Sequence, residues 1–170
     1  LTSIEAIPGV ESVGAGSTLP PTSGFRCCWG GQVRAETELE DAPITIVHPV
    51  TPDYLDVIGA TILRGRGFIQ TDTDVASAPA MVNETTARFL FGEEEPVGKD
   101  IFFADTRWRV VGVVQDIRHW GLHRESQHNV YVPDAIFGGM FKRFQVGVKT
   151  SVDAETLGTT LRQAVWSVDP

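Results

Sequence analysis

Residues 83–114 read NETTARFLFGEEEPVGKDIFFADTRWRVVGVV, and this stretch decides the fold class because it combines a helix with strands. Asn83 is a favourable N-cap, and Gly92 at the C′ position ends the predicted helix Glu84–Phe91. Two predicted strands and the turn that joins them follow: Ile101–Phe103, Trp108–Val114 and the turn Ala104–Thr106. The stretch therefore indicates a mixed α and β fold.

Further strands are predicted on both sides of this stretch, where β-branched or alternating apolar residues occur. They are Val10–Ala15, Ile44–Val47, Ala60–Leu63, Val130–Val132 and Phe144–Lys149. In the last of these, Phe144, Val146 and Val148 alternate with polar residues or glycine, which predicts one buried face. Residues 17–43 are irregular, and we expect some pairing around Trp29–Val33 within them.

Two further helices are predicted from their caps. Thr51 is the expected N-cap of a short helix that has Pro52 in its first position and ends at Gly59. Ser151 or Asp153 caps a C-terminal helix. Its expected apolar stripe is Leu157, Leu161, Ala164, Val165 and Val168. Leu1, Ile4 and Ile7 read as the tail of an amphipathic helix.

Composition excludes several functional classes. The chain has 170 residues, with 14 Lys and Arg against 22 Asp and Glu, so its net charge is −8 and no nucleic-acid partner is expected. With 42% hydrophobic residues it is a folded globular protein. No run of about 18 apolar residues occurs. Cys27 and Cys28 are adjacent and define no disulfide framework.

Two glycine-containing stretches resemble nucleotide-binding motifs but depart from them. Gly92–Asp100 has five residues between its glycines instead of four, and Asp100 replaces the Ser or Thr that binds Mg²⁺. In the stretch that begins Gly14-Ala15-Gly16, Leu19 replaces the third glycine and two prolines forbid the helix that would bind pyrophosphate. We therefore predict no cofactor-binding residues and no cofactor.

The candidates for a metal site or for catalysis are also weak. His119, His123 and His128, with Glu125, suggest zinc, but Gly121 interrupts the helix that would align the first two. The acidic residues Asp72 and Asp74, and Glu93 to Glu95, are typical of a solvated surface. The two cysteines have no recognisable base nearby in sequence. The chain is therefore predicted to have no catalytic and no metal-binding residues, and not to be an enzyme.

One compact basic spot remains, Arg64-Gly65-Arg66-Gly67. Two guanidinium groups at this spacing suit a phosphate or a carboxylate, and the same spacing suits a tight turn. The residues leave both interpretations open.

Five phrases, taken in order, resemble one family. They are LTSIEAIPGVESV (Leu1–Val13), VTPDYLDVIGATILRGRGF (Val50–Phe68), VNETTARFLFGEEEPVGKDI (Val82–Ile101), WRVVGVVQDIRHWG (Trp108–Gly121) and VYVP (Val130–Pro133). Together they resemble the periplasmic core domain of MacB-like, FtsX-like ABC-transporter permeases, and within that family the duplicated orphan permeases of acidobacteria.

The resemblance implies an α+β fold in two parts. Residues 1–72 and 138–170 would form a discontinuous porter-like subdomain of βα and βαβ units from both chain ends. Residues 73–137 would form an inserted, mostly β subdomain. The C-terminal strand should then pair in one sheet with Val10–Ala15 or Ile44–Val47. The expected junction between the parts, a candidate hinge, consists of Arg64, Gly65, Arg66, Gly67 and Phe68.

The resemblance also implies a location and a role. The domain would lie outside the inner membrane and couple ATP-driven motion of membrane helices to partner docking or substrate extrusion. Its expected partners are the transmembrane helices of the same permease, a cytoplasmic ABC ATPase, and a second periplasmic domain or protomer, or a periplasmic adaptor. The alternative is a periplasmic ligand-binding or sensor module that uses the Arg64 and Arg66 turn.

Overall fold

The long strand β7 (Thr106–Val114) organises the sheet, because three other strands pair with it. In the computed structural model, which describes residues 1–20, 29–35, 42–73, 78–103, 105–119, 126–137 and 144–167, nine strands join one sheet. The other strands are β1 (Val10–Gly16), β2 (Trp29–Gln32), β3 (Ile44–Val50), β4 (Ile62–Gly65), β5 (Pro79–Asn83), β6 (Asp100–Phe103), β8 (Asn129–Pro133) and β9 (Gln145–Thr150). Their order is β4-β7-β5-β8-β3-β1-β9, with β2 also on β3 and β6 also on β7.

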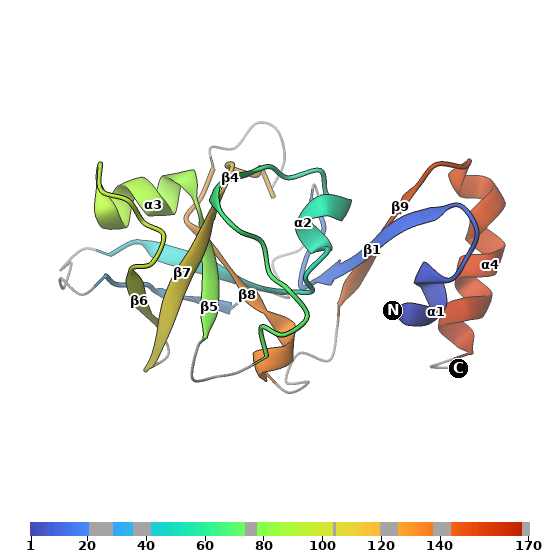
Figure 1. The fold of residues 1–170 in the computed structure, drawn as a ribbon, viewed down its shortest axis with the longest axis horizontal. Helices are drawn as coiled ribbons and strands as arrows, with labels where there is room; N and C mark the ends of the chain where they lie inside the picture. Colours follow the sequence, from blue (N-terminus) through green and yellow to red (C-terminus); the bar gives the residue numbers. More distant parts are fainter. Residues whose placement is uncertain are drawn as a thin grey trace.

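The elements form a body and an arm (Figure 1). The helices are α1 (Thr2–Glu5), α2 (Tyr54–Val57), α3 (Glu84–Phe91) and α4 (Ala154–Trp166), with a 3-10 helix η1 (Asp134–Phe137). We call β1, β9, α1 and α4 the arm, and the remaining described elements the body. The N-terminus and the C-terminal end of α4 both lie in the arm, and the N-terminus is on the side of α1 that faces the body.

Two apolar clusters cover opposite faces of the body sheet. On β8, Val130 and Val132 belong to one cluster, whereas Tyr131 between them belongs to the other. The first cluster also contacts α3 through Leu90 and Phe91. The second contains Tyr54 and Leu55 of α2. Each central strand is therefore buried on both faces, as is typical of a sheet covered on two sides.

Several predictions from the sequence are confirmed. The Asn83 side chain accepts a hydrogen bond from Thr86 N–H and caps α3, and Gly92 follows the helix with a φ of 60°. The C-terminal strand pairs with the first strand, with Val13 opposite Val148 in an antiparallel ladder. The fold class is α+β, as expected. The sheet also continues from β3 to β8, which pair in parallel.

Three local predictions were wrong. Thr51 does not cap α2: the N-cap residue is Asp53, and Thr51 Oγ1 instead accepts a 2.8 Å hydrogen bond from Ala15 N–H. The strand predicted at 60–63 is β4, two residues later, because it extends to Gly65 opposite Gly112. The expected buried face of β9 is absent, since Val146 is 41% exposed.

The sequence analysis missed one strand and described one helix incompletely. The missed strand is β5, which is fully buried. On α4, Asp153 is the cap and Leu157 is buried, but Val165 is exposed and Val168 lies outside the described residues. A strand forms where pairing was expected within residues 17–43, but this strand, β2, pairs with β3, which follows that stretch.

Candidate functional site between the body and the arm

Helix α2 lies directly on the two arm strands where they leave the body. A Cβ atom added to Gly14 of β1 would lie 2.6 Å from Tyr54 Cα. A Cβ atom added to Gly147 of β9 would lie 2.6 Å from Val57 Cγ1. Gly14, which belongs to the stretch that resembles a dinucleotide motif, and Gly147 therefore allow this close approach. We call this contact region of α2 with β1 and β9 the elbow.

Polar contacts also hold the elbow. The Asp56 carboxylate of α2 accepts a 2.7 Å hydrogen bond from Ser12 Oγ on β1 and a 2.9 Å bond from Lys149 Nζ on β9. These two bonds hold the pKa of Asp56 below its ordinary value, and the bond from Ser12 has the larger effect. The Tyr54 hydroxyl donates to the buried carbonyl of Thr18 at 2.7 Å. Helix α2 is thus bonded to both strands of the arm and to the segment that follows β1.

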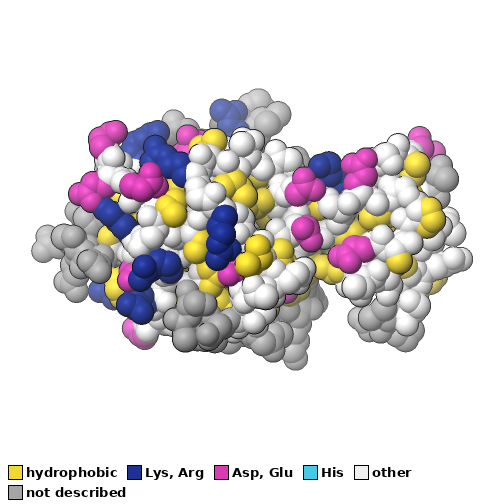
Figure 2. All heavy atoms as spheres, viewed as in Figure 1, with side chains coloured by type: hydrophobic (Ala, Val, Ile, Leu, Met, Phe, Trp, Pro, Cys, Tyr) yellow, Lys and Arg dark blue, Asp and Glu magenta, His cyan; other side chains and the backbone are white. Residues whose placement is uncertain are grey.

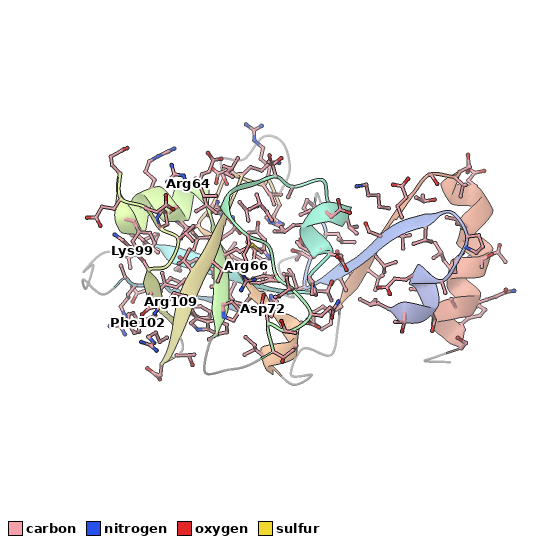
Figure 3. All side chains as sticks on the ribbon, viewed as in Figure 1. Arg64, Arg66, Asp72, Lys99, Phe102 and Arg109 are labelled. Atoms are coloured by element: carbon pink, nitrogen blue, oxygen red, sulfur yellow. The ribbon has the colours of Figure 1, made fainter. Side chains whose placement is uncertain are left out.

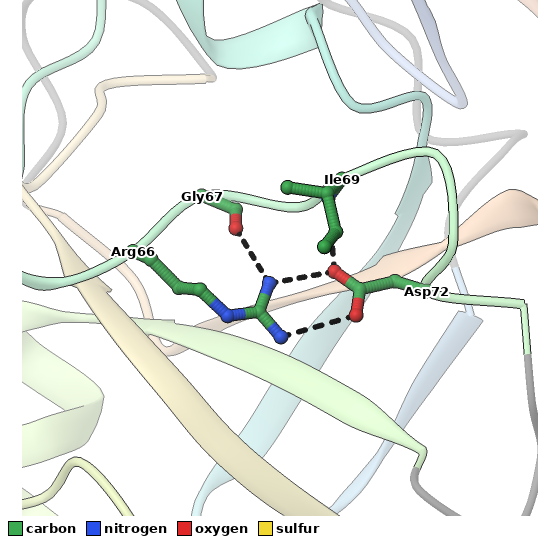
Figure 4. A network of polar contacts seen from close by, with 4 residues as sticks. All are labelled: Arg66, Gly67, Ile69 and Asp72. Carbon is green, nitrogen blue, oxygen red and sulfur yellow. Dashed lines mark hydrogen bonds and ion pairs between the residues drawn. The ribbon is translucent and has the colours of Figure 1, made fainter.

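An ion pair fixes the chain after β4, where the sequence predicted the junction (Figure 4). Arg66 donates from Nη1 to Asp72 Oδ2 at 2.7 Å and from Nη2 to Oδ1 at 3.1 Å. Asp72 Oδ2 also accepts Ile69 N–H at 2.9 Å. Partial burial raises the pKa of Asp72, but the bonds from Arg66 and Ile69 outweigh it, so the pKa is lowered. Residues 66–72 therefore form a loop that is held together by these hydrogen bonds and this ion pair.

The other residues of the predicted junction have different surroundings. Gly65 ends β4 with a φ of 72°, and Phe68 is buried in the cluster below α2. Arg64 is exposed, with Nη1 3.9 Å from Glu95 Oε2. Asp72 already engages Arg66 in a bidentate pair. This weakens the interpretation of Arg64 and Arg66 as a joint anion site, because one of its two guanidinium groups is already paired.

An open cleft of about 440 Å³ separates the arm from the body. Leu1, Thr2, Glu5 and Val13 line it from the arm, and 51–53, 69–70, 72–73 and 133–135 line it from the body. Its carboxylates are Glu5, Asp53, Asp72 and Asp134. Burial raises the pKa of Asp134. The ion pair of the predicted junction thus forms part of the wall that faces the arm.

The histidines that were weighed as zinc ligands have different surroundings. His119 is buried and stacks on His48, with ring centroids 4.4 Å apart, while His128 contacts Phe89 edge to face. His123 and Glu125 lie outside the described residues. Within the part of the chain that the structure describes, no three His, Cys, Asp or Glu side chains are placed to hold a metal ion. His48 was missed because the strand predicted at Ile44–Val47 ended one residue before it, whereas β3 continues to Val50.

The glycine loop after α3 is a structural turn. Gly92 and Gly98 have positive φ angles of 60° and 88°. Lys99 forms an ion pair with Glu94 and lies over the Phe91 ring, 5.3 Å from its centroid. This lysine is therefore engaged by its own loop. Cys27, Cys28 and Asp74 lie outside the described residues.

No helix among the described residues is long and apolar enough to cross a membrane.

Solved structures with this fold have been found among permease domains. The crystal structure of the periplasmic region of MacB from Actinobacillus actinomycetemcomitans matches 98% of this chain and 71% of its own, with a TM-score of 0.71 at 18% identity. The extracellular domain of the noncanonic ABC-type transporter YknZ from Gram-positive bacteria matches 99% of this chain and 79% of its own, with a TM-score of 0.68 at 20% identity. These likenesses show a shared fold.

Curated relatives are similar in sequence. The macrolide export ATP-binding/permease protein MacB of Aggregatibacter actinomycetemcomitans is 30% identical over 87 residues, which are 51% of this chain and 13% of the relative. That of Bdellovibrio bacteriovorus is 30% identical over 111 residues, 65% of this chain and 17% of the relative. This chain therefore spans only a small part of the relatives it matches.

The family model of the MacB-like periplasmic core domain matches residues 2–164, nearly the whole chain. This family is a periplasmic domain of transporter permeases. The match, the similar sequences and the shared fold agree with the resemblance of the five phrases. The chain therefore belongs to the MacB-like periplasmic core domain family, and it is the periplasmic domain of a MacB-like ABC-transporter permease.

Proposed function

We propose that this domain transmits ATP-driven motion of the permease's membrane helices to events outside the membrane, and that it performs no catalysis itself. One observation carries the proposal. The N-terminus and the end of α4 both lie in the arm, and the arm meets the body at an elbow where α2 contacts both strands. A module held at its ends by moving helices must itself move, and a braced arm passes that motion to the body.

The cleft supports a specific form of this motion. Because open space of about 440 Å³ separates the two parts, the arm has room to approach the body or swing away from it.

We also propose a junction between the two predicted subdomains, of which one comprises residues 1–72 and 138–170 and the other residues 73–137. The junction consists of Arg64, Gly65, Arg66, Gly67 and Phe68. The bonded loop at Arg66 and Asp72, which reaches the cleft wall, supports that choice.

The lack of catalysis is supported by how the polar side chains are used. Arg66, Asp72, Lys99 and Asp56 are engaged in ion pairs that hold the fold. The proposed partners are the transmembrane helices of the same permease, an ABC ATPase on the cytoplasmic side, and a second periplasmic domain, protomer or adaptor. The ATP-binding/permease nature of the similar MacB proteins supports the first two.

A crosslink across the cleft tests the proposal. In a cysteine-free version of the full-length permease complex, Glu5→Cys and Asp134→Cys place one thiol on each wall. Joining them with a cleavable bismaleimide should abolish transport-linked function while ATP hydrolysis continues, because the arm can no longer move against the body. Cleaving the linker should restore transport.

The matched control joins two positions on one wall. Thr73→Cys with Asp134→Cys places both thiols on the body, so the same linker should leave transport unchanged. Normal transport by the complex crosslinked between Glu5→Cys and Asp134→Cys would contradict force transmission through this domain.

A further inference from the structure

Three arginines and a phenylalanine share one face at the edge of the body. Phe102 of β6 lies directly opposite Arg107 of β7 on one side and opposite Arg34 on the other. Asp100 lies opposite Arg109. Residues directly opposite each other in antiparallel strands project to the same side of a sheet, as do residues two apart in one strand. We call these five residues the arginine face.

This face points outward. The residues that alternate with it are buried in the cluster below α3: Val33, Ile101, Phe103, Trp108 and Val110. The side chains of Arg107 and Arg109 are 62% and 49% exposed. Phe102, which lies between Arg107 and Arg34 across the strands, is half-buried. The described part of the sheet therefore presents a flat surface of guanidinium groups around an aromatic ring.

The face is basic although the chain is acidic overall. Its single carboxylate, Asp100, serves two arginines: Arg109 Nε lies 2.5 Å from Oδ1, and Arg107 Nη1 lies 3.6 Å from Oδ2. Arg107 and Arg109 thus share one carboxylate, which leaves an excess of positive charge here in a chain of net charge −8. Figure 2 shows Lys and Arg side chains gathered on the body, whereas Asp and Glu predominate around the arm.

The arginine face lies at the end of the body away from the arm. Figure 3 shows Phe102, Arg109 and Lys99 at this end, opposite the end that carries both chain termini. An open cleft of about 520 Å³ adjoins the face and shares Asp100 and Arg109 with it. Lys99 and Phe91 also line this cleft, so it offers a recess beside the flat surface.

We propose that the arginine face docks an acidic segment of a partner protein outside the membrane. A carboxylate of the segment binds Arg107, which is 62% exposed and lies 3.6 Å from Asp100, and an apolar side chain packs on Phe102. Arg109, which Asp100 already engages through Nε and Nη2, adds positive charge beside Arg107. Guanidinium groups suit this partner because they bind carboxylates through two parallel hydrogen bonds and remain charged at any physiological pH. The proposal rests on the proposed function, since it is membrane attachment through the arm that directs this end toward the periplasm. It adds where and by what chemistry a partner binds.

Site-specific photocrosslinking tests the docking. Phe102 is replaced by p-benzoylphenylalanine in the full-length permease, in the cells that produce it, and the crosslinked peptide is sequenced. The expected product is a protein segment rich in Asp and Glu. Changing Arg107→Glu together with Arg109→Glu should lower the crosslink yield at least about tenfold, because charge complementarity governs such contacts.

Two controls match these changes. The same photoreactive residue in place of Phe89, which is 40% exposed on α3, should not capture that segment. The charge reversal Arg162→Glu on the arm should leave the yield at Phe102 unchanged. Where the double reversal lowers the amount of folded permease, Arg107→Glu alone serves, since Arg107 forms a 3.6 Å ion pair with Asp100 and is mostly exposed.

The proposal is overturned by crosslinks to lipid only, by a captured segment without an acidic cluster, by a yield that charge reversal does not change, or by no crosslink. These outcomes are independent of the cleft experiment, because that linker joins Glu5→Cys to Asp134→Cys and does not involve this face. A failed docking test therefore leaves force transmission standing.

Discussion

The buried histidine pair is a residue-scale feature with a consequence for acid stability. The rings of His48 and His119 stack, and His119 Nε2 lies 2.9 Å from the Tyr131 hydroxyl. His48 Nε2 lies 2.8 Å from Asn129 Oδ1, and Thr18 Oγ1 is 3.4 Å from the other ring nitrogen. Burial lowers the pKa of His48 to about 4. Burial and the neighbouring His48 lower the pKa of His119 to about 3.

Acidification from pH 7 to pH 5 should therefore lower the free energy of unfolding. In the unfolded chain both imidazoles take up a proton near pH 6.5, whereas in the folded chain they stay neutral until far lower pH. The stabilising contribution is complete above the unfolded pKa and is lost as the pH falls below it. The expected loss is about 2 kcal/mol per histidine at pH 5. Urea unfolding at the two pH values measures it.

The variant His119→Gln separates this effect from other titrations. It removes one titrating ring while keeping a polar group near Tyr131, so the loss between pH 7 and pH 5 should fall by about 2 kcal/mol. The lowered pKa values of Asp56 and Asp72 place their effects at lower pH, outside this window. An equal pH dependence in the variant and the parent would contradict the assignment to the histidine pair.

Gly65 is the second residue whose surroundings predict a measurable effect. Its φ is 72°, and a Cβ atom would lie 2.2 Å from the Val111 carbonyl oxygen. Gly65→Ala should lower the free energy of unfolding by about 2–4 kcal/mol, because the side chain is strained and overlaps backbone. Gly67→Ala is the matched control, expected to cost less than about 1 kcal/mol, since its Cβ meets only the flexible end of Ile62. Equal losses in urea unfolding would contradict this account.

At the scale of elements, local patterns predicted some strands and helices and missed others. Helix α3 was predictable because Asn83 and Gly92 mark its ends within the sequence itself. Strand β5 was not, because it begins at a proline and is buried on both faces, so it lacks alternation. Strand β9 shows alternation but no buried face, because it lies in the arm, where fewer elements cover it.

The candidate site was harder to predict than the fold, because its contacts join residues far apart in the chain. The Arg64–Phe68 stretch stood out through its composition. Its ion pair with Asp72 depends on a loop geometry that composition does not specify. The elbow depends on Gly14 and Gly147 meeting α2, and sequence reasoning assigned neither glycine that role. The arginine face appears only once β6 and β7 are paired in register.

At the scale of the whole molecule, charge is distributed so that it opposes closure of the cleft. Glu5 on the arm faces a body wall that includes Asp53 and Asp134. Like charges repel across such a gap, with energies of about 1 kcal/mol at 4 Å in water and less at larger separations or higher salt. The open arrangement is therefore favoured at neutral pH, and a motion that closes the cleft must work against this repulsion.

Neutralising both walls should shift the molecule toward a closed form. Glu5→Gln with Asp134→Asn removes the repulsion, and a change of a fraction of a kcal/mol alters the ratio of closed to open molecules by up to about threefold. Spin labels at Arg88→Cys on α3 and Arg162→Cys on α4 report the distance between body and arm. The mean distance should shorten in the neutralised variant, and high salt should shorten it in the parent by screening the same charges.

The control Glu93→Gln with Glu155→Gln changes the net charge equally but away from this cleft, so the distance should stay at the parent value. A neutralised variant with the parent's distance distribution would show that packing at the elbow, and not charge across the cleft, sets the angle of the arm.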